Sequence, residues 1–298
     1  MTTTTAPRAL PWPLVLAMVA VTPYLTLKLL WLTGSPIGLT EAATETMRST
    51  RFVVGNLVTV GLELVALGLA WSLTRPWADR LPARLFALLA AGASGLLAPI
   101  LLGMPLGQVV ETIAHGRPSV EGEGMAAWVF GCVYGGFTLL GVALAVLLCR
   151  YADGRWGASF ASPPRVQRRL TFALGAVTVL PFALAMGWWG VAGPGDAGPQ
   201  GMEAPVQRTV LVVSGLLALA AVVAPSARLA VPPQRGRLPH LVVWVGCCTA
   251  ALQGPTQLLL AHGGTIQPAV AAITLLATPG ALAVLAGVHG DLRSVGAR

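Results

Sequence analysis

The sequence predicts an all-α, polytopic membrane protein of about eight transmembrane helices, built as two tandem four-helix repeats with both termini in the cytoplasm. Three observations predict this class: the composition, a series of long apolar runs, and landmarks shared by the two halves of the chain. Of the 298 residues, 55% are hydrophobic and 10% are charged, and the mean hydropathy is +0.74. Soluble domains carry about 25% charged residues. The solvent for most of this chain is therefore predicted to be lipid.

The apolar runs are long enough to cross a bilayer, which takes about 20 residues in a helix. The runs cover residues 14–32, 52–73, 85–104, 125–148, 170–191, 209–224, 238–260 and 269–288. Each run is bounded by Pro, Gly or a charged residue, and Pro225 with Arg228 cuts the sixth one short. The first run is too long for a signal-peptide core and lacks a small-residue cleavage site. Between the first two runs, residues 40–51 can form a short interfacial helix capped by Thr40.

The basic residues predict the orientation of the chain. If the termini lie in the cytoplasm, the inner segments carry Arg8, Arg75, Arg80, Arg84, Arg150, Arg155, Arg165, Arg168, Arg169, Arg228, Arg235, Arg237, Arg293 and Arg298. The outer loops carry Arg48, Arg51, Arg117 and Arg208. This bias follows the positive-inside rule for a plasma-membrane protein. It also accounts for the net charge of +8, so nucleic-acid binding is not expected.

The two halves, residues 1–156 and 157–298, share landmarks in the same order. They are Pro23 with Trp31 and Pro181 with Trp189, Arg80-Leu81-Pro82 and Arg237-Leu238-Pro239, and the run ALAVL before Asp153 and again before Asp291. Four spans per unit is an even number, so both units enter the membrane in the same direction. The expected relation is a pseudo-twofold axis along the membrane normal, and the seam between such halves is a common place for a pocket.

Only the first half carries charge inside its apolar runs. Glu63 lies near the middle of the second run, with Asn56 and Thr59 seven and four residues before it on one helical face. An ionised carboxylate at that depth is expensive, so Glu63 is expected to be neutral, paired or facing water. This asymmetry predicts that function resides mainly in the first half.

The first run carries a matching polar stripe of Tyr24, Lys28 and Trp31. Lys28 can reach the membrane surface with its long side chain, or it can point inward to Glu63 or to an acidic residue of a loop. Tyr24 lies nearer the depth of Glu63 and is expected to hydrogen-bond to it. Both alternatives for Lys28 remain open from the sequence.

Further candidate substrate-binding residues lie in the second half. Gln253 and Gln257 share one helical face around Pro255, where they either line a pocket or form interhelical hydrogen bonds. Trp188 and Trp189 either contact a substrate or belong to an interfacial aromatic belt.

The segment before the fourth run contains Gln108, Glu111 and His115 and is expected to be an outer loop. Glu111 and His115 can join Glu63 or Glu41 in a metal site, but such spacing alone is a weak signal, and no metal is predicted. The four cysteines have no CxxC spacing. Nucleotide-loop, zincin, serine-elbow and haem motifs are not found in the sequence, and no cofactor is predicted.

The run Tyr24–Gly34 contains Leu-Lys-Leu-Leu-Trp-Leu-Thr-Gly. It resembles the Leu-Lys-x-x-Trp-x-x-Gly-Gly signature of small four-helix actinobacterial membrane proteins of unknown function, with Ser35 at the second Gly. The stretches RLPARLFALLAAGASGLLAPI (Arg80–Ile100) and VYGGFTLLG (Val133–Gly141) resemble larger, duplicated members. The resemblance implies a duplicated four-helix unit and no established chemistry.

In size and setting, the chain also resembles the integral-membrane terpene cyclases of natural-product gene clusters, although it matches no diagnostic motif. Such enzymes protonate a prenyl olefin or epoxide with a buried acid, and aromatic faces shield the carbocation. The resemblance implies a lipophilic isoprenoid substrate.

The first functional hypothesis is therefore a proton-initiated cyclase, because an apolar pocket favours the protonated carboxyl group that a general acid needs. Glu63 would be the acid, with Tyr24 and Asn56 orienting it and Glu111 as the next candidate. The second hypothesis is a transporter or channel subunit in which Glu63 and Lys28 couple to protons or bind substrate. The third is a structural or regulatory membrane protein without catalysis. The sequence does not fix the oligomeric state.

Overall fold

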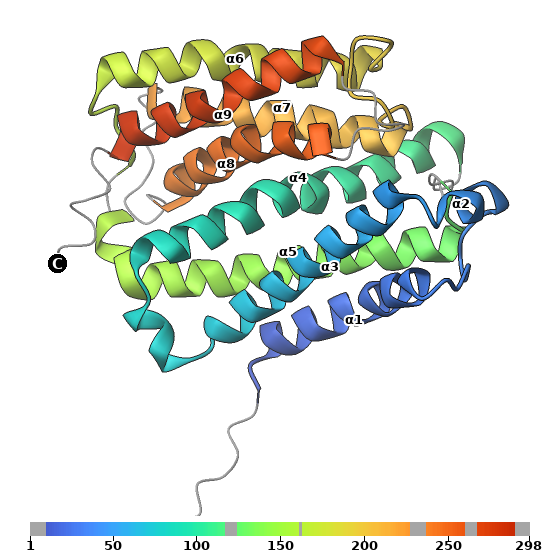
Figure 1. The fold of residues 1–298 in the computed structure, drawn as a ribbon. Helices are drawn as coiled ribbons and strands as arrows, with labels where there is room; N and C mark the ends of the chain where they lie inside the picture. Colours follow the sequence, from blue (N-terminus) through green and yellow to red (C-terminus); the bar gives the residue numbers. More distant parts are fainter. Residues whose placement is uncertain (1–9, 117–123, 161–162, 227–236, 260–266, 290–298) are drawn as a thin grey trace, which may run out of the picture.

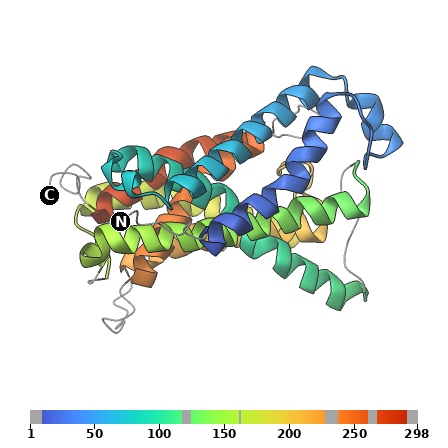
Figure 2. The ribbon, with the colours of Figure 1, turned by 90° about the horizontal axis from the view of Figure 1, so that it is seen from below.

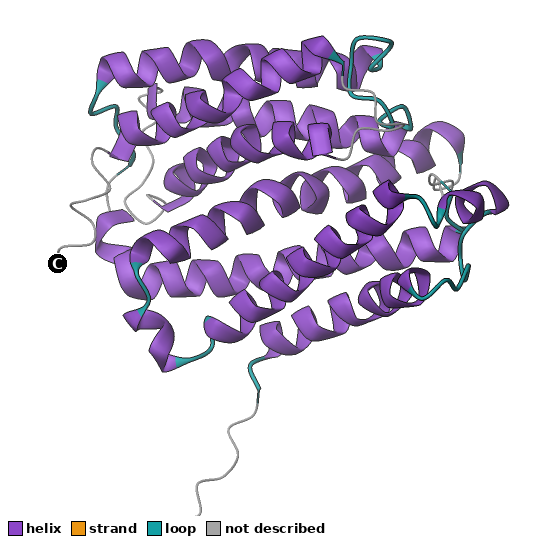
Figure 3. Cartoon of the chain, in the orientation of Figure 1, coloured by secondary structure: helices purple, strands orange, loops and turns teal. Residues whose placement is uncertain are grey.

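The structure is a computed structural model that describes residues 10–116, 124–160, 163–226, 237–259 and 267–289. Within these segments every regular element is helical, and one isolated β-bridge joins Leu39 to Met125 (Figure 3). The predicted all-α class is confirmed for the described part of the chain.

In the described segments, eight long helices and one short helix make up most of the structure (Figure 1). They are α1 (Trp12–Leu32), α2 (Glu41–Thr46), α3 (Thr50–Ser72), α4 (Ala83–His115), α5 (Ala127–Trp156), α6 (Arg169–Ala192), α7 (Pro205–Ser226), α8 (Arg237–Leu259) and α9 (Pro268–His289). Two short 3-10 helices, η1 (Pro76–Arg80) and η2 (Gly157–Phe160), follow α3 and α5. Each long helix covers all or nearly all of one predicted apolar run.

Seven described helices are long and apolar enough to cross a membrane: α1, α3, α4, α5, α6, α7 and α9. The protein is therefore a multi-pass membrane protein whose apolar helices suit a lipid bilayer. Helix α8 has 23 residues, which is enough length, but it is less apolar. Polar residues and prolines at both of its ends, among them His240 and Gln253, account for the lower hydropathy.

Local sequence explains the helix boundaries. The Thr40 hydroxyl accepts a hydrogen bond from the Ala43 backbone N–H at 3.4 Å, so the predicted cap of α2 is confirmed. Helix α4 ends at His115 and is followed by Gly116, whose φ of +71° is a left-handed conformation that suits glycine.

The expectation of an outer loop over residues 108–115 is wrong, because α4 continues through Pro99 and Pro105 as far as His115. Helices tolerate proline where neighbouring groups satisfy the freed backbone atoms.

The long helices form two groups that lie side by side (Figure 1). In the second half, α6, α7, α8 and α9 pack in a closed ring, in which each helix contacts two neighbours extensively. In the first half, α5 lies between α1 and α4, and α3 packs on α1. Helix α4 packs against α7 and α8 and so forms the seam between the groups. Tandem repeats would produce this grouping, and the duplication itself stays a prediction.

The first group is open where the second is closed. Helix α7 packs against α6, α8 and α4, whereas α3 contacts α1, touches α5 little and scarcely approaches α4. In Figure 2, α3 and α1 diverge from α4 toward the end of the bundle that carries α2. We call this end the α2 end. The opening places α3 at the edge of the molecule.

At the opposite end, side chains of α5 bind the segment that contains η1. The Tyr151 hydroxyl donates to the Ala78 carbonyl oxygen at 3.0 Å, and the Arg155 guanidinium donates to the Leu81 carbonyl oxygen at 3.1 Å. Asp153 forms an ion pair at 2.6 Å with Arg237 of α8 and so joins the two groups. Outside the described residues lie Arg8, Arg117, Arg228, Arg235, Arg293 and Arg298 of the charge count and Asp291 of the repeat.

Candidate functional site

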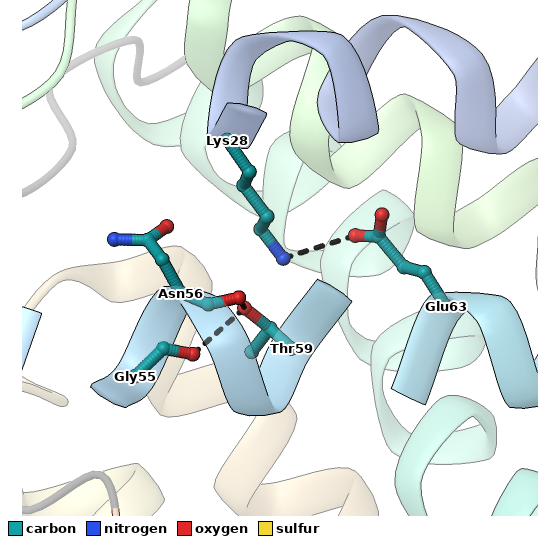
Figure 4. A network of polar contacts seen from close by, with 5 residues as sticks. All are labelled: Lys28, Gly55, Asn56, Thr59 and Glu63. Atoms are coloured by element: carbon teal, nitrogen blue, oxygen red, sulfur yellow. Dashed lines mark hydrogen bonds and ion pairs between the residues drawn. The ribbon is translucent and has the colours of Figure 1, made fainter. Parts of the chain in front are cut away.

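A buried ion pair joins α1 to α3. The Lys28 ammonium donates a hydrogen bond to Glu63 Oε1 at 3.0 Å (Figure 4). Lys28 has no exposed surface, and Glu63 is 3% exposed. The structure thus resolves the alternatives for Lys28: its side chain points inward to Glu63 and not to the surface of the bundle.

Helical spacing places Lys28 and Tyr24 one turn apart on the same side of α1. The Lys28 Nζ atom lies 3.8 Å from the centroid of the Tyr24 ring, within the range of a cation–π interaction. The ammonium group thus contacts a carboxylate from α3 and the face of an aromatic ring from its own helix. Both contacts favour a charged Lys28 in an otherwise apolar setting.

Other aromatic rings surround this pair. Tyr24 makes edge-to-face contacts with Trp31 and with Phe137 of α5, at centroid distances of 6.1 and 5.5 Å. Trp31 also packs against Phe52 of α3 at 6.3 Å, and its indole N–H donates to the Ile37 carbonyl oxygen at 2.8 Å. These contacts fix the ring of Trp31 and hold the site between α1, α3 and α5.

The second oxygen of Glu63 has no hydrogen-bond partner among the described residues, although it is buried. Glu63 borders a narrow hollow between α1, α3 and α5 that is too tight to hold a water molecule. Its walls are Ala20, Val21, Tyr24, Val133, Gly136, Phe137 and Leu140. A buried polar atom without a partner costs about 1–3 kcal/mol. One carboxylate oxygen therefore remains available for a proton or a ligand.

The polar stripe of α3 binds its own backbone and not Glu63. The Asn56 side-chain amide donates to the Phe52 carbonyl oxygen at 2.9 Å. The Thr59 hydroxyl donates to the carbonyl oxygens of Gly55 and Asn56 at 2.8 and 3.1 Å. In Figure 4 the Asn56 amide points away from Glu63, so the expected hydrogen bond that would orient the acid is not formed.

Tyr24 is also placed differently from the expectation. It borders the same hollow as Glu63 and presents its ring face to Lys28, while no hydrogen bond from its hydroxyl to Glu63 is found in the described structure. Tyr24 therefore shapes the site through its ring.

Glu111 lies elsewhere, on the extension of α4. Its carboxylate pairs with His115 Nδ1 at 3.2 Å, and α4 scarcely approaches α3. Within the described segments, no group of three or more His, Cys, Asp or Glu side chains lies close enough together to hold a metal ion.

The candidate residues of the second half do not join the Lys28–Glu63 pair. Trp188 is 68% exposed at the surface of α6, whereas Trp189 is buried in the core of the second helix group. Gln253 is buried and Gln257 is half-buried on α8, which packs mainly against α4, α7 and α9. Of the ten predicted site residues, the structure brings together Glu63, Lys28, Tyr24 and Trp31.

Sequence reasoning missed Phe52, Gly136 and Phe137. At Gly136 a Cβ atom would lie 2.7 Å from the Ala20 carbonyl oxygen, so glycine permits the close approach of α1 and α5 beside the hollow. The adjacent glycines before Phe137 were a usable signal, because small residues mark close helix packing in membranes.

The fold and the site together define an all-helical multi-pass membrane protein with a buried, aromatic-flanked ion pair. No protein-family model matches the chain, and neither a curated protein nor a solved structure matches it. The functional argument therefore rests on the site itself.

Proposed function

We propose that the protein is a proton-coupled transporter of small molecules, with the Lys28–Glu63 pair as its proton-exchanging site. The observation that supports this most is that the pair is buried and connects α1 to α3, the most loosely packed long helix of the bundle. Ionisable residues within membrane helices commonly belong to proton relays and substrate pathways, where they pair with one another.

Stability alone is a poor reason for such a pair. Burying two charges carries a desolvation cost that their attraction often fails to exceed, and apolar residues of similar volume are frequently as stable or more stable. The rings around the pair show that an apolar contact between α1 and α3 is available at this position. A role that depends on the charge explains why an ion pair occupies it.

Proton exchange is coupled to helix movement through Lys28 and Glu63. The ion pair is lost when Lys28 gives up its proton or when Glu63 accepts one. Either change removes a charge–charge contact between α1 and α3, and α3 has few other neighbours that resist its movement. Proton exchange at the pair would thus shift α3 relative to α4 and expose the hollow beside Glu63. The closed second group would act as the fixed scaffold.

The topology proposed with this function has eight crossings, with α8 as the eighth, and both termini in the cytoplasm. Helix α8 runs between α7 and α9 in the ring of the second group, which supports its inclusion. The arginine bias supports the orientation and a plasma-membrane location.

The test uses purified protein in lipid vesicles that contain a pH-sensitive dye and have a pH gradient across the membrane. Three probes share a phenyl group and differ in charge: benzyltrimethylammonium, benzenesulfonate and benzyl alcohol. We expect at least one probe to change the internal pH with wild-type protein and not with Glu63→Gln. The control is Asp196→Asn, because this carboxylate is exposed in a loop. If no probe moves protons, or if Glu63→Gln behaves like wild type, the proposal is wrong.

A membrane terpene cyclase is the second candidate, and the unpartnered oxygen of Glu63 beside Tyr24 and Phe137 favours it. This function requires two changes in the site. Glu63 must become protonated despite its contact with Lys28, and the hollow, which is too tight for a water molecule, must open to the size of a ligand pocket, usually about 300–1,000 Å³.

Membranes with wild-type protein or Glu63→Gln, incubated with farnesylated and other prenylated substrates, test the cyclase by mass spectrometry and NMR. An isomeric cyclised product that the variant fails to form supports the cyclase and identifies Glu63 as its acid. If Glu63→Gln still forms the product, another residue is the acid, and Glu111 is the next candidate. No product from any of these substrates contradicts the cyclase.

A further inference from the structure

We infer that the site beside Glu63 binds a monovalent organic cation with an apolar body, and that the Lys28 ammonium balances the charge of Glu63 in the absence of that cation. The inference rests on the proposed transporter function and names its substrate class. A carboxylate together with an aromatic face is a set of groups that recognises an alkylammonium ion. Lys28 is itself an alkylammonium ion that contacts one of each, at 3.0 and 3.8 Å.

The neighbourhood of Glu63 contains the parts that a second cation needs. Glu63 Oε2 is buried, lacks a partner among the described residues and borders the hollow. The walls of the hollow are otherwise apolar or aromatic, so they suit a hydrocarbon body once the proposed movement of α3 widens the hollow. An anion would meet the carboxylate of Glu63 at the same wall, so charge favours a cation.

The charges of the site predict an exchange. The titratable groups that face Glu63 are Lys28 and Tyr24 from α1, and Tyr134 of α5 packs against the same aromatic cluster. Lys28 and Glu63 together are neutral, so an added cation would leave a net positive charge in an apolar site. The site stays neutral if Lys28 loses its proton to water as the cation binds to Glu63. One cation then enters for each proton released, which is the stoichiometry of an antiporter.

This exchange gives cation binding a defined pH dependence. Because binding releases a proton, a higher pH favours the cation-bound form. Where one proton is released per cation, the affinity rises by up to about tenfold per pH unit.

The experiment measures the binding of benzyltrimethylammonium to wild-type protein in lipid nanodiscs by equilibrium dialysis, together with proton release in weakly buffered solution. We expect saturable binding with about one proton released per cation, and an affinity that rises with pH. Neopentylbenzene, the uncharged analogue of the same shape, should not compete. Equal competition by the uncharged analogue, or cation binding without proton release, contradicts the inference. Both results need only wild-type protein.

Two variants sharpen the test. Glu63→Gln removes the negative charge and should weaken binding of the cation at least about tenfold, because the attraction between opposite charges is strong in a site shielded from water. Lys28→Arg keeps the positive charge, but a guanidinium does not lose its proton in proteins. Lys28→Arg should therefore retain the fold, checked by size-exclusion chromatography and thermal unfolding, and lose both cation binding and proton release. A structural ion pair would tolerate arginine, so a folded Lys28→Arg protein that binds the cation like wild type contradicts the inference.

The outcomes also separate this inference from the proposed function. Benzenesulfonate or benzyl alcohol, and not the cation, could move protons in a Glu63-dependent manner in the vesicle assay. In that case the transporter proposal stands, and the inference of a cationic substrate is wrong. If no probe moves protons, the transporter proposal itself fails.

Discussion

Helices α3 and α7 are similar in sequence character and different in surroundings. Their mean hydropathies are 2.0 and 2.2, yet 17% of the apolar window is buried inside the molecule in α3 and 44% in α7. Around α7, glycines allow close contact between helices: a Cβ at Gly215 would lie 2.6 Å from the Ala183 carbonyl oxygen. On α3, the positions of Gly55, Gly61 and Gly68 face open space. Helix α7 is held by packing, whereas α3 depends more on single contacts.

The Lys28–Glu63 pair is the polar contact that joins α3 to α1. It lies between a loosely held helix and a better-packed one, so a change of charge in the pair acts on the helix that has fewer other contacts. The closed ring of the second group has buried polar side chains, such as Ser214 and Thr274, that bond to the backbone of their own helices. Such bonds do not change with protonation. This difference is the basis for assigning function to the first half.

The largest expected effect on stability comes from removing one member of the pair. Lys28→Met leaves Glu63 buried without its counter-ion, which should lower the free energy of unfolding by about 3 kcal/mol at neutral pH. Denaturant titration of the purified protein in detergent measures this change. The double variant Lys28→Met/Glu63→Leu should recover most of the loss, because an apolar pair replaces the ion pair. A double variant as unstable as the single one would show that the packing at Lys28, and not its charge, matters.

A matched pair of glycine substitutions tests the difference in packing between α3 and α7. Gly215→Ala places a methyl group 2.6 Å from the Ala183 carbonyl oxygen and 2.9 Å from the Gly187 nitrogen. It should destabilise the protein by about 2 kcal/mol through overpacking. Gly61→Ala meets nothing within 4 Å and should stabilise α3 by about 0.5 kcal/mol, because alanine favours helix. Equal effects at the two positions in the same denaturant titration would contradict the described packing.

The smallest effect is expected for the ion pair between Arg237 and Asp153. It joins the two groups, but the side chains are 60% and 41% exposed. Exposed pairs contribute about 0.5 kcal/mol. Arg237→Ala should therefore change the free energy of unfolding by no more than about that amount, and 0.5 M salt should reduce the difference. A loss as large as that of Lys28→Met would show that the halves depend on this contact.

The sequence predicts the helices of this fold well because each is a continuous apolar run with a polar or proline-rich boundary. The extension of α4 to His115 could not be predicted in this way, because Gln108, Glu111 and His115 interrupt the apolar pattern without ending the helix. A polar stretch at a membrane surface has the same composition in a helix and in a loop.

The candidate site could be predicted only in part. The depths of Lys28 and Glu63 in their runs made pairing one of two alternatives, and the structure selects it. The outward position of α3 was not predictable, because α3 and α7 are nearly equal in hydropathy and the difference arises from contacts between helices. The tryptophans of α6 were grouped with the site because aromatic side chains suit a lipophilic substrate, but they lie in the other helix group.

The most direct test of the central claim is the distance between α3 and α4 in the presence and absence of the ion pair. Spin labels at Leu64→Cys on α3 and Leu102→Cys on α4 report this distance by pulsed electron paramagnetic resonance, and both positions are exposed. Labels at Leu216→Cys on α7 and Leu102→Cys provide the matched control. The background carries Cys132→Ser and Cys149→Ser, because these two cysteines are not fully buried.

Without the pair, in Glu63→Gln, we expect the α3–α4 distance distribution to shift and broaden while the α7–α4 distribution stays unchanged. That result would establish that the Lys28–Glu63 contact sets the position of α3. Identical α3–α4 distributions in the wild type and the variant would contradict the account, because the ion pair would then not control the helix through which proton exchange is proposed to act.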